Sequence, residues 1–448
     1  MSNDMVFTQN EIAKFSAKDA AQYPLYCDKL SKFARILDNV IDSIPPDISH
    51  PQLKLNATKL SSINFSEHLQ TLQRLIPSVA ALSDKNDAAD FISLLLAPAE
   101  DILNSHFESE ILKSTLATDA VIGALVSPKT PGSGYVLLHH VMNDGNWSYV
   151  EGGMGAISNA IAAEALRLGV EIRTNAPVEE IVVNDEGEVR GVRLECGEFI
   201  DSNLVVSNAT PHITFNKLLT PASKAQHINP DLLKTISNFD YSSATTKINV
   251  AVSRLPNFSN DDTNIVRPHH EGTIHLGCET MDQLHSAFID THVDNKISNL
   301  PLIEMTIPSS LDKTITPPDQ NQHVVNLFCQ YTPFNPNETE EDKQNIKNKM
   351  FAVVDKYAPN FSSSVIGKPD ILTPLELEKQ FSLTGGNIMH GAMGLERLFF
   401  SRPTAELADY KVSDIRGLYI CGAGCHPGGG VMGAAGRNAA RKILTDCG

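Results

Sequence analysis

The C-terminal end of the chain constrains its fold most strongly, because it places a dense group of glycines between an apolar segment and a helix. Residues 417–421 read Gly-Leu-Tyr-Ile-Cys, which predicts a short buried strand. Seven of the residues in 422–436 are glycine, and the small-residue pattern of 437–444 predicts a helix. Glycine lets a backbone come close to a flat ligand, and a helix N-terminus offers free N–H groups and positive potential. We expect a seat here for a flat, polar group that can become anionic.

A flavin ring has these properties. Hydride addition to the ring builds negative charge at its pyrimidine end, and fixed N–H dipoles at residues 431–433 would stabilise that charge. The alternative is a glycine turn that only packs the following helix, and spacing alone does not separate the two. Residues 428–433 match G-x-G-x-x-G, but a dinucleotide fingerprint needs a following βαβ unit and an acidic residue about 20 positions on. Only 15 residues follow Gly433, so this fingerprint is excluded.

Size and charge narrow the class of protein. A chain of 448 residues exceeds the roughly 250–300 residues at which single cores stop growing, which predicts two domains. The 53 acidic and 36 basic residues give a net charge of −17, which argues against nucleic-acid partners. Seven scattered cysteines indicate free thiols in a reducing compartment. We expect neither a membrane span nor a targeting segment.

The N-terminal part of the chain has helical spacing of its apolar residues. Residues 9–42 and 63–126 are expected to be helical, and Pro24 is expected to begin a new helix rather than lie inside one. The Pro- and Gly-rich residues 128–134 predict a loop.

The order of the elements expected in the middle of the chain is typical of an α/β nucleotide-binding domain. The expected elements are a tight turn at 151–155, a helix at 156–168, a strand at 170–174, a hairpin at 179–184 and 188–195 with its turn at 185–187, and a buried parallel strand at 204–208. Alternating runs at 247–252, 273–276, 302–307 and 323–331 then predict an antiparallel sheet with one covered face. Helices are expected at 340–357 and 374–381.

Several of these motifs together resemble a known family. Residues 149–156 (Tyr-Val-Glu-Gly-Gly-Met-Gly-Ala), residues 204–209 and residues 422–431 are similar to segments of the phytoene-desaturase-like branch of the FAD-dependent amine oxidase superfamily. Residues 116–124, 131–140 and 247–252 extend the resemblance over nearly the whole chain. The resemblance implies an α/β fold, in which an FAD-binding domain of the Rossmann-like, three-layer type is interleaved with a substrate domain of antiparallel sheet plus helices.

The implied domain boundaries follow this alternation. Residues 1–131 and 216–384 would form the substrate domain, and residues 132–215 and 385–448 would form the FAD-binding domain. The family begins with a strand, a G-x-G-x-x-G turn and an acidic residue, and this chain shows none of them, so the FAD-binding domain is expected to be incomplete. A truncated form, a partial gene product and a protein that does not retain FAD are all compatible with this difference.

The resemblance also implies a set of site residues. The cofactor-binding residues would be Val178, Gly422, Ala423, Gly430, Val431, Met432 and Gly433. Gly422 and Ala423 would lie near the ribityl–pyrophosphate arm, residues 430–433 would lie against the pyrimidine end of the ring, and the backbone of Val178 would face the adenine. Lys247 would be catalytic, holding a water near flavin N5. The alternative for Lys247 is a lysine at a strand end that reaches solvent.

The function implied is an FAD-dependent oxidoreductase that transfers hydride from a small apolar or amine substrate to flavin N5. The alternative is a non-catalytic regulatory or interaction protein. The resemblance further implies the mitochondrial matrix, with a possible mitochondrial protein partner and a small-molecule substrate.

Five other residues near these motifs also have expected roles. Cys421 and Cys425 have three residues between them, which is not the spacing of a flavoprotein redox disulfide. His426 would bond to the backbone of its turn or contact substrate. Trp147 and Tyr149 would pack in the core or line a cavity.

Two adjacent histidine pairs are not expected to bind a metal. His139–His140 and His269–His270 would lie on opposite faces if each pair belonged to a strand. No metal site is therefore expected in this chain.

Overall fold

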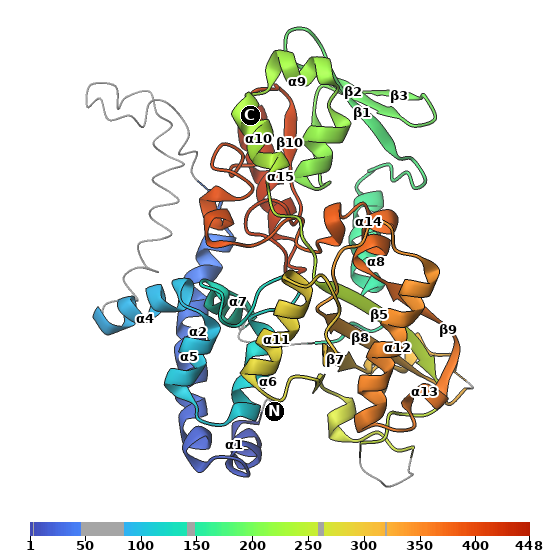
Figure 1. The fold of residues 1–448 in the computed structure, drawn as a ribbon. Coiled ribbons are helices and arrows are strands. Elements are labelled where there is room, and N and C mark those ends of the chain that lie inside the picture. Colours follow the sequence, from blue (N-terminus) through green and yellow to red (C-terminus); the bar gives the residue numbers. More distant parts are fainter. Residues whose placement is uncertain (3, 46–84, 141–147, 259–263, 319) are drawn as a thin grey trace. The chain divides into compact units, whose positions relative to one another are not determined.

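The computed structural model describes the chain except for residues 3, 46–84, 141–147, 259–263 and 319 (Figure 1). The chain forms two compact units, each built from three segments. Unit 1 comprises Met1–Lys29, Leu94–Arg173 and Ser243–Gln380, and unit 2 comprises Leu30–Ser93, Thr174–Ser242 and Phe381–Gly448. The chain therefore passes repeatedly between the units. The domain boundaries given above stay a prediction.

Unit 1 contains a five-stranded antiparallel sheet with the strand order β6-β7-β8-β5-β9. Its strands are β5 (Thr245–Val252), β6 (Ile274–Leu276), β7 (Leu302–Thr306), β8 (His323–Gln330) and β9 (Val365–Leu372). The four strands expected from sequence alternation are confirmed. The edge strand β9 was not expected, because Gly367 and Pro369 interrupt its pattern.

Helices α12 (Glu340–Tyr357) and α13 (Phe361–Ser364) cover one face of this sheet (Figure 1). The predicted helix at 340–357 is confirmed, and a capping box between Thr339 and Asp342 begins it. Buried strand residues such as Val250 and Val325 pack with Met350 and Phe361 in one apolar cluster. This cluster explains the alternation in the sequence, because every second strand residue faces the helices.

The remaining helices of the first half bring one correction. They are α1 (Met5–Ala13), α2 (Ala17–Ile41), α4 (Lys85–Leu96), α5 (Ala99–His106), α6 (Glu110–Asp119), α7 (Ser133–His140), α8 (Gly155–Arg167) and, later in the chain, α11 (Met281–His292). The expectation that Pro24 begins a new helix is wrong, because Pro24 lies inside α2. Proline removes the N–H that would bond to the carbonyl of Ala20. The side chain of Gln9 donates to that carbonyl instead, at 2.8 Å, so the helix continues with its carbonyl satisfied.

Unit 2 contains a parallel strand pair and a β-meander. The pair is β4 (Val205–Ser207) with β10 (Leu418–Ile420), and the antiparallel meander is β1 (Val178–Val183), β2 (Val189–Leu194) and β3 (Phe199–Asp201). The predicted hairpin is confirmed, and so is the parallel strand expected at 204–208. The expectation that this strand is buried is wrong, because Val206 is 41% exposed. The strand expected at 170–174 is wrong: within the described residues no neighbouring strand pairs with that segment, and a strand alone has no ladder to stabilise it.

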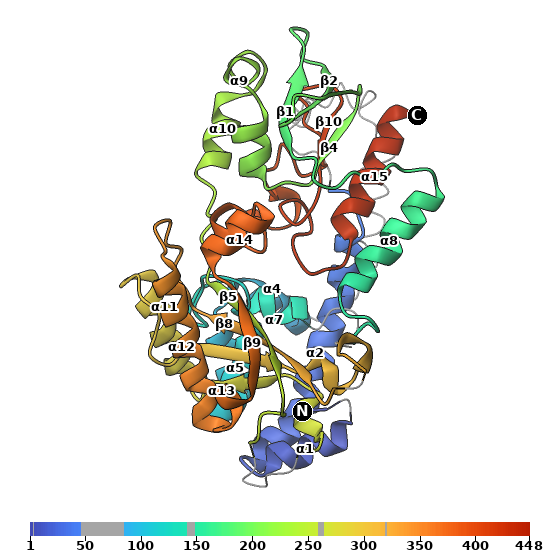
Figure 2. The same cartoon turned by 90° about the vertical axis from the view of Figure 1, so that its right-hand side faces the viewer.

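One apolar core in unit 2 holds its second and third chain segments together. Helices α9 (Pro221–His227), α10 (Pro230–Ser237) and α15 (Ala434–Cys447) accompany the strands. Helix α14 (Pro374–Phe381) belongs to unit 1 except for its last residue. Ile181 and Phe215 pack with Leu418, Ile420 and Ala439 in one buried cluster. Figure 2 shows α15 beside the β4–β10 pair. The chain is thus an α/β protein with a parallel pair in one unit and an antiparallel sheet in the other, as expected.

Candidate functional site

The glycine turn, residues 422–433, connects β10 to α15 in unit 2. All three residues of β10 are buried, which fixes where the turn begins. At its other end, Gly433 is the N-cap of α15 and has a left-handed φ of 65°. Val431 also has a positive φ, of 54°. A left-handed conformation costs a non-glycine residue roughly 1–2 kcal/mol, and such strain gathers at functional sites.

The first half of the glycine turn is packed against the protein itself. A Cβ on Gly424 would lie 2.6 Å from the Cδ of Pro211, and one on Gly429 would lie 2.5 Å from the sulfur of Met389. Real Cβ atoms essentially never come this close to another atom. The Pro211 ring is fixed to its backbone, so a larger residue at Gly424 would shift the main chain, whereas at Gly429 the flexible Met389 side chain could move aside. Gly424 is therefore required for packing, which is the alternative that the sequence left open for the turn.

The second half of the turn is open. A Cβ on Gly433 would meet no atom within 4 Å, and Val431 is 82% exposed. Within the described residues, no acceptor bonds to the main-chain N–H groups of Val431, Met432 or Gly433, and no side chain caps α15. Unpaired N–H groups at a helix N-terminus suit an anionic edge. Residues 430–433 therefore fit the pyrimidine end of a flavin.

The turn is anchored to the end of α2 by polar contacts within unit 2. The Nε2 atom of His426 lies 3.0 Å from the carbonyl oxygen of Val40, and Asn438 of α15 donates to the carbonyl of Ile41 at 2.8 Å. The hydroxyl of Tyr410 donates to the carbonyl of His426 at 2.9 Å. His426 is buried, so it positions the backbone rather than presenting a polar group at the surface.

Arg402 is the residue of this region that sequence reasoning missed. Its side chain is fully buried, and its guanidinium donates to main-chain carbonyls at 2.6 to 3.5 Å. These carbonyls belong to Met389, Gly391, Ala392, Arg397 and Ala423. A buried charge is tolerated when its donors are satisfied in this way. Burial, followed by the Arg402 charge, lowers the pKa of the nearby His390 to about 4. No sequence signal marks an arginine as buried.

Cys421 and Cys425 follow β10 and are both free thiols. Burial raises the pKa of each thiol above its ordinary value. A raised thiol pKa reduces the thiolate fraction and with it the reactivity. The two cysteines therefore contribute packing to the turn, in line with their spacing.

Val178 begins β1 and pairs with Leu194 of β2. It belongs to unit 2, as the glycine turn does, but among the described residues no main-chain hydrogen bond joins Val178 to the turn. A contact between its backbone and an adenine stays a prediction.

Lys247 lies on β5 in unit 1, on the sheet face opposite α12. The pairing register aligns Lys247 with Phe328 of β8, and Phe328 with Glu304 of β7. The Lys247 side chain is exposed, and no ion pair or hydrogen bond engages it within the described residues. An exposed, unengaged lysine suits either the predicted water-holding role or solvent contact. Its catalytic role stays a prediction, since it belongs to unit 1 and the turn to unit 2.

Glu304, whose side chain is 12% exposed, is a largely buried carboxyl on the same sheet face, and sequence reasoning did not single it out. Its Oε1 lies 4.0 Å from the Nδ1 of His275 on β6. Burial, and then the negative charge of Asp119 on α6, raise the pKa of Glu304 to about 8. Burial also lowers the pKa of His275 to about 4. Both groups are therefore neutral near pH 7, so their contact is no ion pair there. The sequence pattern predicted an open second face here, but α6 covers part of it through the contact of Thr118 with His275.

The adjacent histidines differ from the strand geometry assumed for them. His269 and His270 lie in a short 3₁₀ turn (Pro268–His270), and their Nε2 atoms are 3.1 Å apart. The backbone N–H of Arg267 donates to Nδ1 of His270, and Nε2 of His270 also lies 3.0 Å from the carbonyl of Pro256. His270 thus carries its proton on Nε2, which a metal would have to displace. No group of three or more His, Cys, Asp or Glu residues in the described ranges could hold a metal ion.

The other sequence candidates are placed as follows. Tyr149 is exposed, so it does not pack in the core as expected for such aromatics. His139 and His140 lie in α7 rather than on a strand. Trp147 lies outside the described residues.

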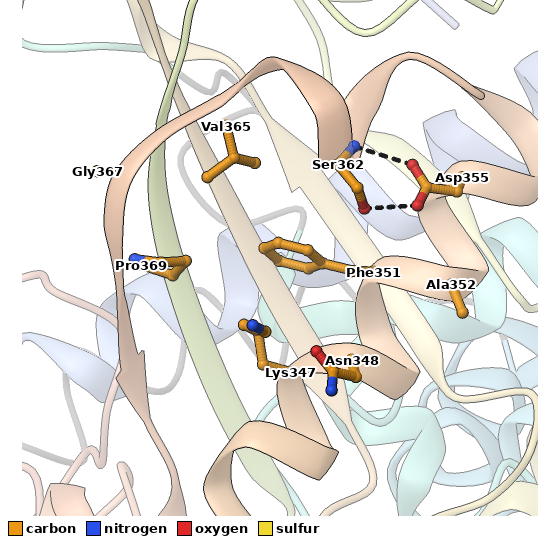
Figure 3. A pocket seen from close by; sticks show the side chains of 9 residues that line it. All are labelled: Lys347, Asn348, Phe351, Ala352, Asp355, Ser362, Val365, Gly367 and Pro369. Carbon is orange, nitrogen blue, oxygen red and sulfur yellow. Dashed lines mark hydrogen bonds between the residues drawn. The ribbon is translucent and has the colours of Figure 1, made fainter.

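A shallow groove of about 450 Å³ lies between α12 and β9 in unit 1 (Figure 3). Lys347 and Phe351 line it from the helix, and Gly367 and Pro369 line it from the strand. The Asp355 side chain accepts from the N–H of Ser362 at one end. The groove contains none of the residues predicted for the site.

Among the described helices, none is both long and apolar enough to cross a membrane.

The chain resembles known proteins over most of its length. The family model of flavin-containing amine oxidoreductases matches residues 15–355. The Mus musculus "pyridine nucleotide-disulfide oxidoreductase domain-containing protein 2" is 44% identical over 458 residues, covering all of this chain and 76% of the mouse protein. The lycopene-forming phytoene desaturase of Pseudescherichia vulneris is 26% identical over 308 residues, covering 68% of this chain and 58% of the desaturase.

Among solved structures, cyclohexylamine oxidase from Brevibacterium oxydans matches with a TM-score of 0.45 and 16% identity, over 89% of this chain and 78% of the oxidase. The family match covers more than half of the chain, and the mouse relative matches its full length. The chain therefore belongs to the flavin-containing amine oxidoreductase family, and is by family an FAD-dependent oxidoreductase.

Proposed function

We propose that this chain oxidises a small apolar or amine-bearing molecule with FAD as its hydride acceptor. The observation that carries the proposal is the open half of the glycine turn. There, three successive main-chain N–H groups have no acceptor among the described residues, and a strained, exposed valine precedes the N-terminus of α15. The family match supports FAD as the cofactor.

The chemistry that FAD supplies when bound is the acceptance of hydride at ring N5, with negative charge gathering at the pyrimidine end. The N–H groups of Val431, Met432 and Gly433 would donate to that end. The macrodipole of α15 would add about 0.3–1 kcal/mol of stabilisation. Lys247 would hold a water through its ammonium group, which is accessible and not engaged by another described side chain.

Retention of FAD tests the proposal directly. We expect the purified chain, mixed with FAD, to keep yellow absorbance through gel filtration. Gly430→Trp should remove this absorbance by filling the open half of the turn. Gly197→Trp is the matched control, because Gly197, between β2 and β3 of unit 2, has a positive φ as Gly430 has, and no atom would lie within 4 Å of its Cβ. A chain that stays colourless with added FAD would refute the catalytic proposal, and equal retention by both variants would refute the placement of the flavin.

We also propose the mitochondrial matrix as the location, on the sequence resemblance alone. Protease protection of the endogenous protein in isolated mitochondria, with and without rupture of the inner membrane, tests it. Degradation before the inner membrane is ruptured would contradict the matrix.

A second candidate function is a non-catalytic interaction protein. The observation that favours it is α8 in unit 1, which buries none of its residues and exposes Ile157 and Ile161. Apolar side chains exposed on one helix are typical of a protein-binding surface. Under this proposal, Ile161→Glu abolishes capture of an endogenous partner, whereas Gly430→Trp leaves it unchanged. Loss of capture in the Gly430→Trp variant would tie the interaction to the flavin site instead.

A further inference from the structure

Arg402 fixes the plane of one peptide bond in the glycine turn. Its Nε and Nη2 atoms both donate to the carbonyl oxygen of Ala423, at 3.1 and 2.9 Å. Two donors of a planar fork on one oxygen restrict that oxygen far more than a single donor does. The remaining donors of the guanidinium bond to Met389, Gly391 and Ala392, so the fork itself cannot rotate.

The opposite side of the same peptide bond carries an unsatisfied donor. In a trans peptide, the C=O and the following N–H point in opposite directions. Because the Ala423 carbonyl faces Arg402, the N–H of Gly424 points away from the guanidinium. Gly424 is buried, and within the described residues no acceptor bonds to its N–H. Buried N–H groups without a partner are rare and costly, which indicates an acceptor supplied by a ligand.

We propose that Arg402 is a positioning residue, which holds the Ala423–Gly424 peptide with its N–H directed at the phosphate-bearing arm of FAD. The inference rests on the proposed function, since it takes FAD as the ligand of the turn. Arg402 acts through the peptide and makes no contact with the cofactor itself.

The physical reason lies in the two orientations open to this peptide. With the guanidinium in place, the carbonyl is held inside the protein and the donor faces the anion. Without it, the peptide can rotate until its carbonyl oxygen faces the anion, and two negative groups then repel each other. Lysine keeps the charge but presents no planar fork, so it cannot bond to the Ala423 oxygen through two atoms. The orientation therefore depends on the shape of the guanidinium as well as on its charge.

Ligands with and without phosphate separate this role from a merely structural one. We expect Arg402→Met to weaken binding of FAD and of FMN by about tenfold or more, the value of one hydrogen bond to a charged group. Riboflavin, which has no phosphate, should lose much less affinity. Arg402→Lys should lie between wild type and Arg402→Met. Equal losses for all three flavins, or no loss for FAD, would overturn the proposal.

Arg397→Met is the control variant. Its side chain donates to the carbonyl of Pro403 and contacts the ring of Phe239, and it does not contact Ala423. Removal of this second arginine from the same segment should leave the ratio of FAD to riboflavin affinity unchanged. A changed ratio would show that loss of any nearby cation has the same effect, which contradicts the positioning role.

Amide exchange keeps the proposal testable if the Arg402→Met variant does not fold. In the wild type, added FAD should slow exchange of the Gly424 amide by about tenfold or more, whereas riboflavin should not. Unchanged exchange of this amide in FAD-bound protein would overturn the proposal.

Failure of the proposed function would be recognised separately, as a wild-type chain that binds neither FAD nor FMN. The positioning of the peptide is then tested in the ligand-free chain. The Cys425 amide bonds to the Gly422 carbonyl at 3.0 Å within the turn. Arg402→Lys should speed its exchange by about tenfold, relative to Arg397→Met. Equal exchange in the two variants would show that Arg402 does not hold the turn.

Discussion

Replacement of Glu304 by glutamine should change how the stability of the chain depends on pH. Burial and the charge of Asp119 raise the pKa of this carboxyl from 4.5 to about 8, against the opposing hydrogen bond of Thr118. The folded pKa lies above the unfolded pKa. The contribution of Glu304 to stability is therefore fully present below pH 4.5 and is lost as the pH rises through 8. Glutamine stays neutral at every pH and removes this dependence.

The magnitude follows from the two pKa values. One pKa unit corresponds to about 1.36 kcal/mol, so ionisation of Glu304 in the folded chain costs on the order of 4–5 kcal/mol. Between pH 5 and pH 8 the free energy of unfolding of the wild type should fall by roughly 3–4 kcal/mol through this group alone. The side chain is 12% exposed, so solvent screens this cost only weakly.

Urea unfolding at pH 5, 6, 7 and 8, followed by circular dichroism, measures this change. The difference in unfolding free energy between Glu304→Gln and wild type should move in favour of the variant by roughly 3 kcal/mol over this range. Glu186→Gln, in the exposed turn between β1 and β2, is the control and should run parallel to wild type. Parallel curves for Glu304→Gln, within about 0.5 kcal/mol, would show that the carboxyl is not held neutral by the fold.

Three further predictions concern other parts of the structure. Burial lowers the pKa of His390 to about 4, below its unfolded value of 6.5. The stability that His390 contributes is therefore present above pH 6.5 and is lost as the pH falls toward 4, by on the order of 3 kcal/mol. His390→Gln should reduce this loss, which urea unfolding midpoints at pH 4.5 and pH 7 would measure. Phe361 is fully buried with its ring 5.1 Å from that of Phe351, so Phe361→Ala should lower the free energy of unfolding by about 3–5 kcal/mol, and a loss below 1 kcal/mol would contradict this packing. Thr339→Ala removes the cap of α12 and should cost about 1 kcal/mol in the same assay, whereas Thr339→Ser should be close to neutral.

The elements that could be predicted are those whose signals are local. The hairpin of β1 and β2 was predicted because its apolar alternation is interrupted by Asp185-Glu186-Gly187, and the Gly187 φ of 74° shows why glycine is needed there. The end strand β9 could not be predicted, because Gly367 and Pro369 weaken a strand by themselves. The ladder with β5 stabilises it through contacts more than a hundred residues away in sequence.

The site was predictable only in part, for a similar reason. The glycine turn is visible in the sequence because glycine spacing and a helix start are local patterns. Arg402 and Glu304 are not visible, since a charged residue is mostly exposed and only the assembled fold shows that it is buried. The position of Pro24 inside a helix could not be predicted for the same reason, because the side chain that satisfies the carbonyl of Ala20 is Gln9 of another helix, α1.

The contacts of Arg402 have a consequence for how this region tolerates mutation. Its guanidinium bonds to carbonyl oxygens of the main chain, which are present whatever side chain each position carries. Substitutions at Met389 or Ala392 can therefore leave the network intact, while no neighbouring position can replace the arginine. A substitution at Arg402 would therefore disturb several main-chain segments at once, whereas side-chain changes at Met389 or Ala392 would not remove their bonds to it.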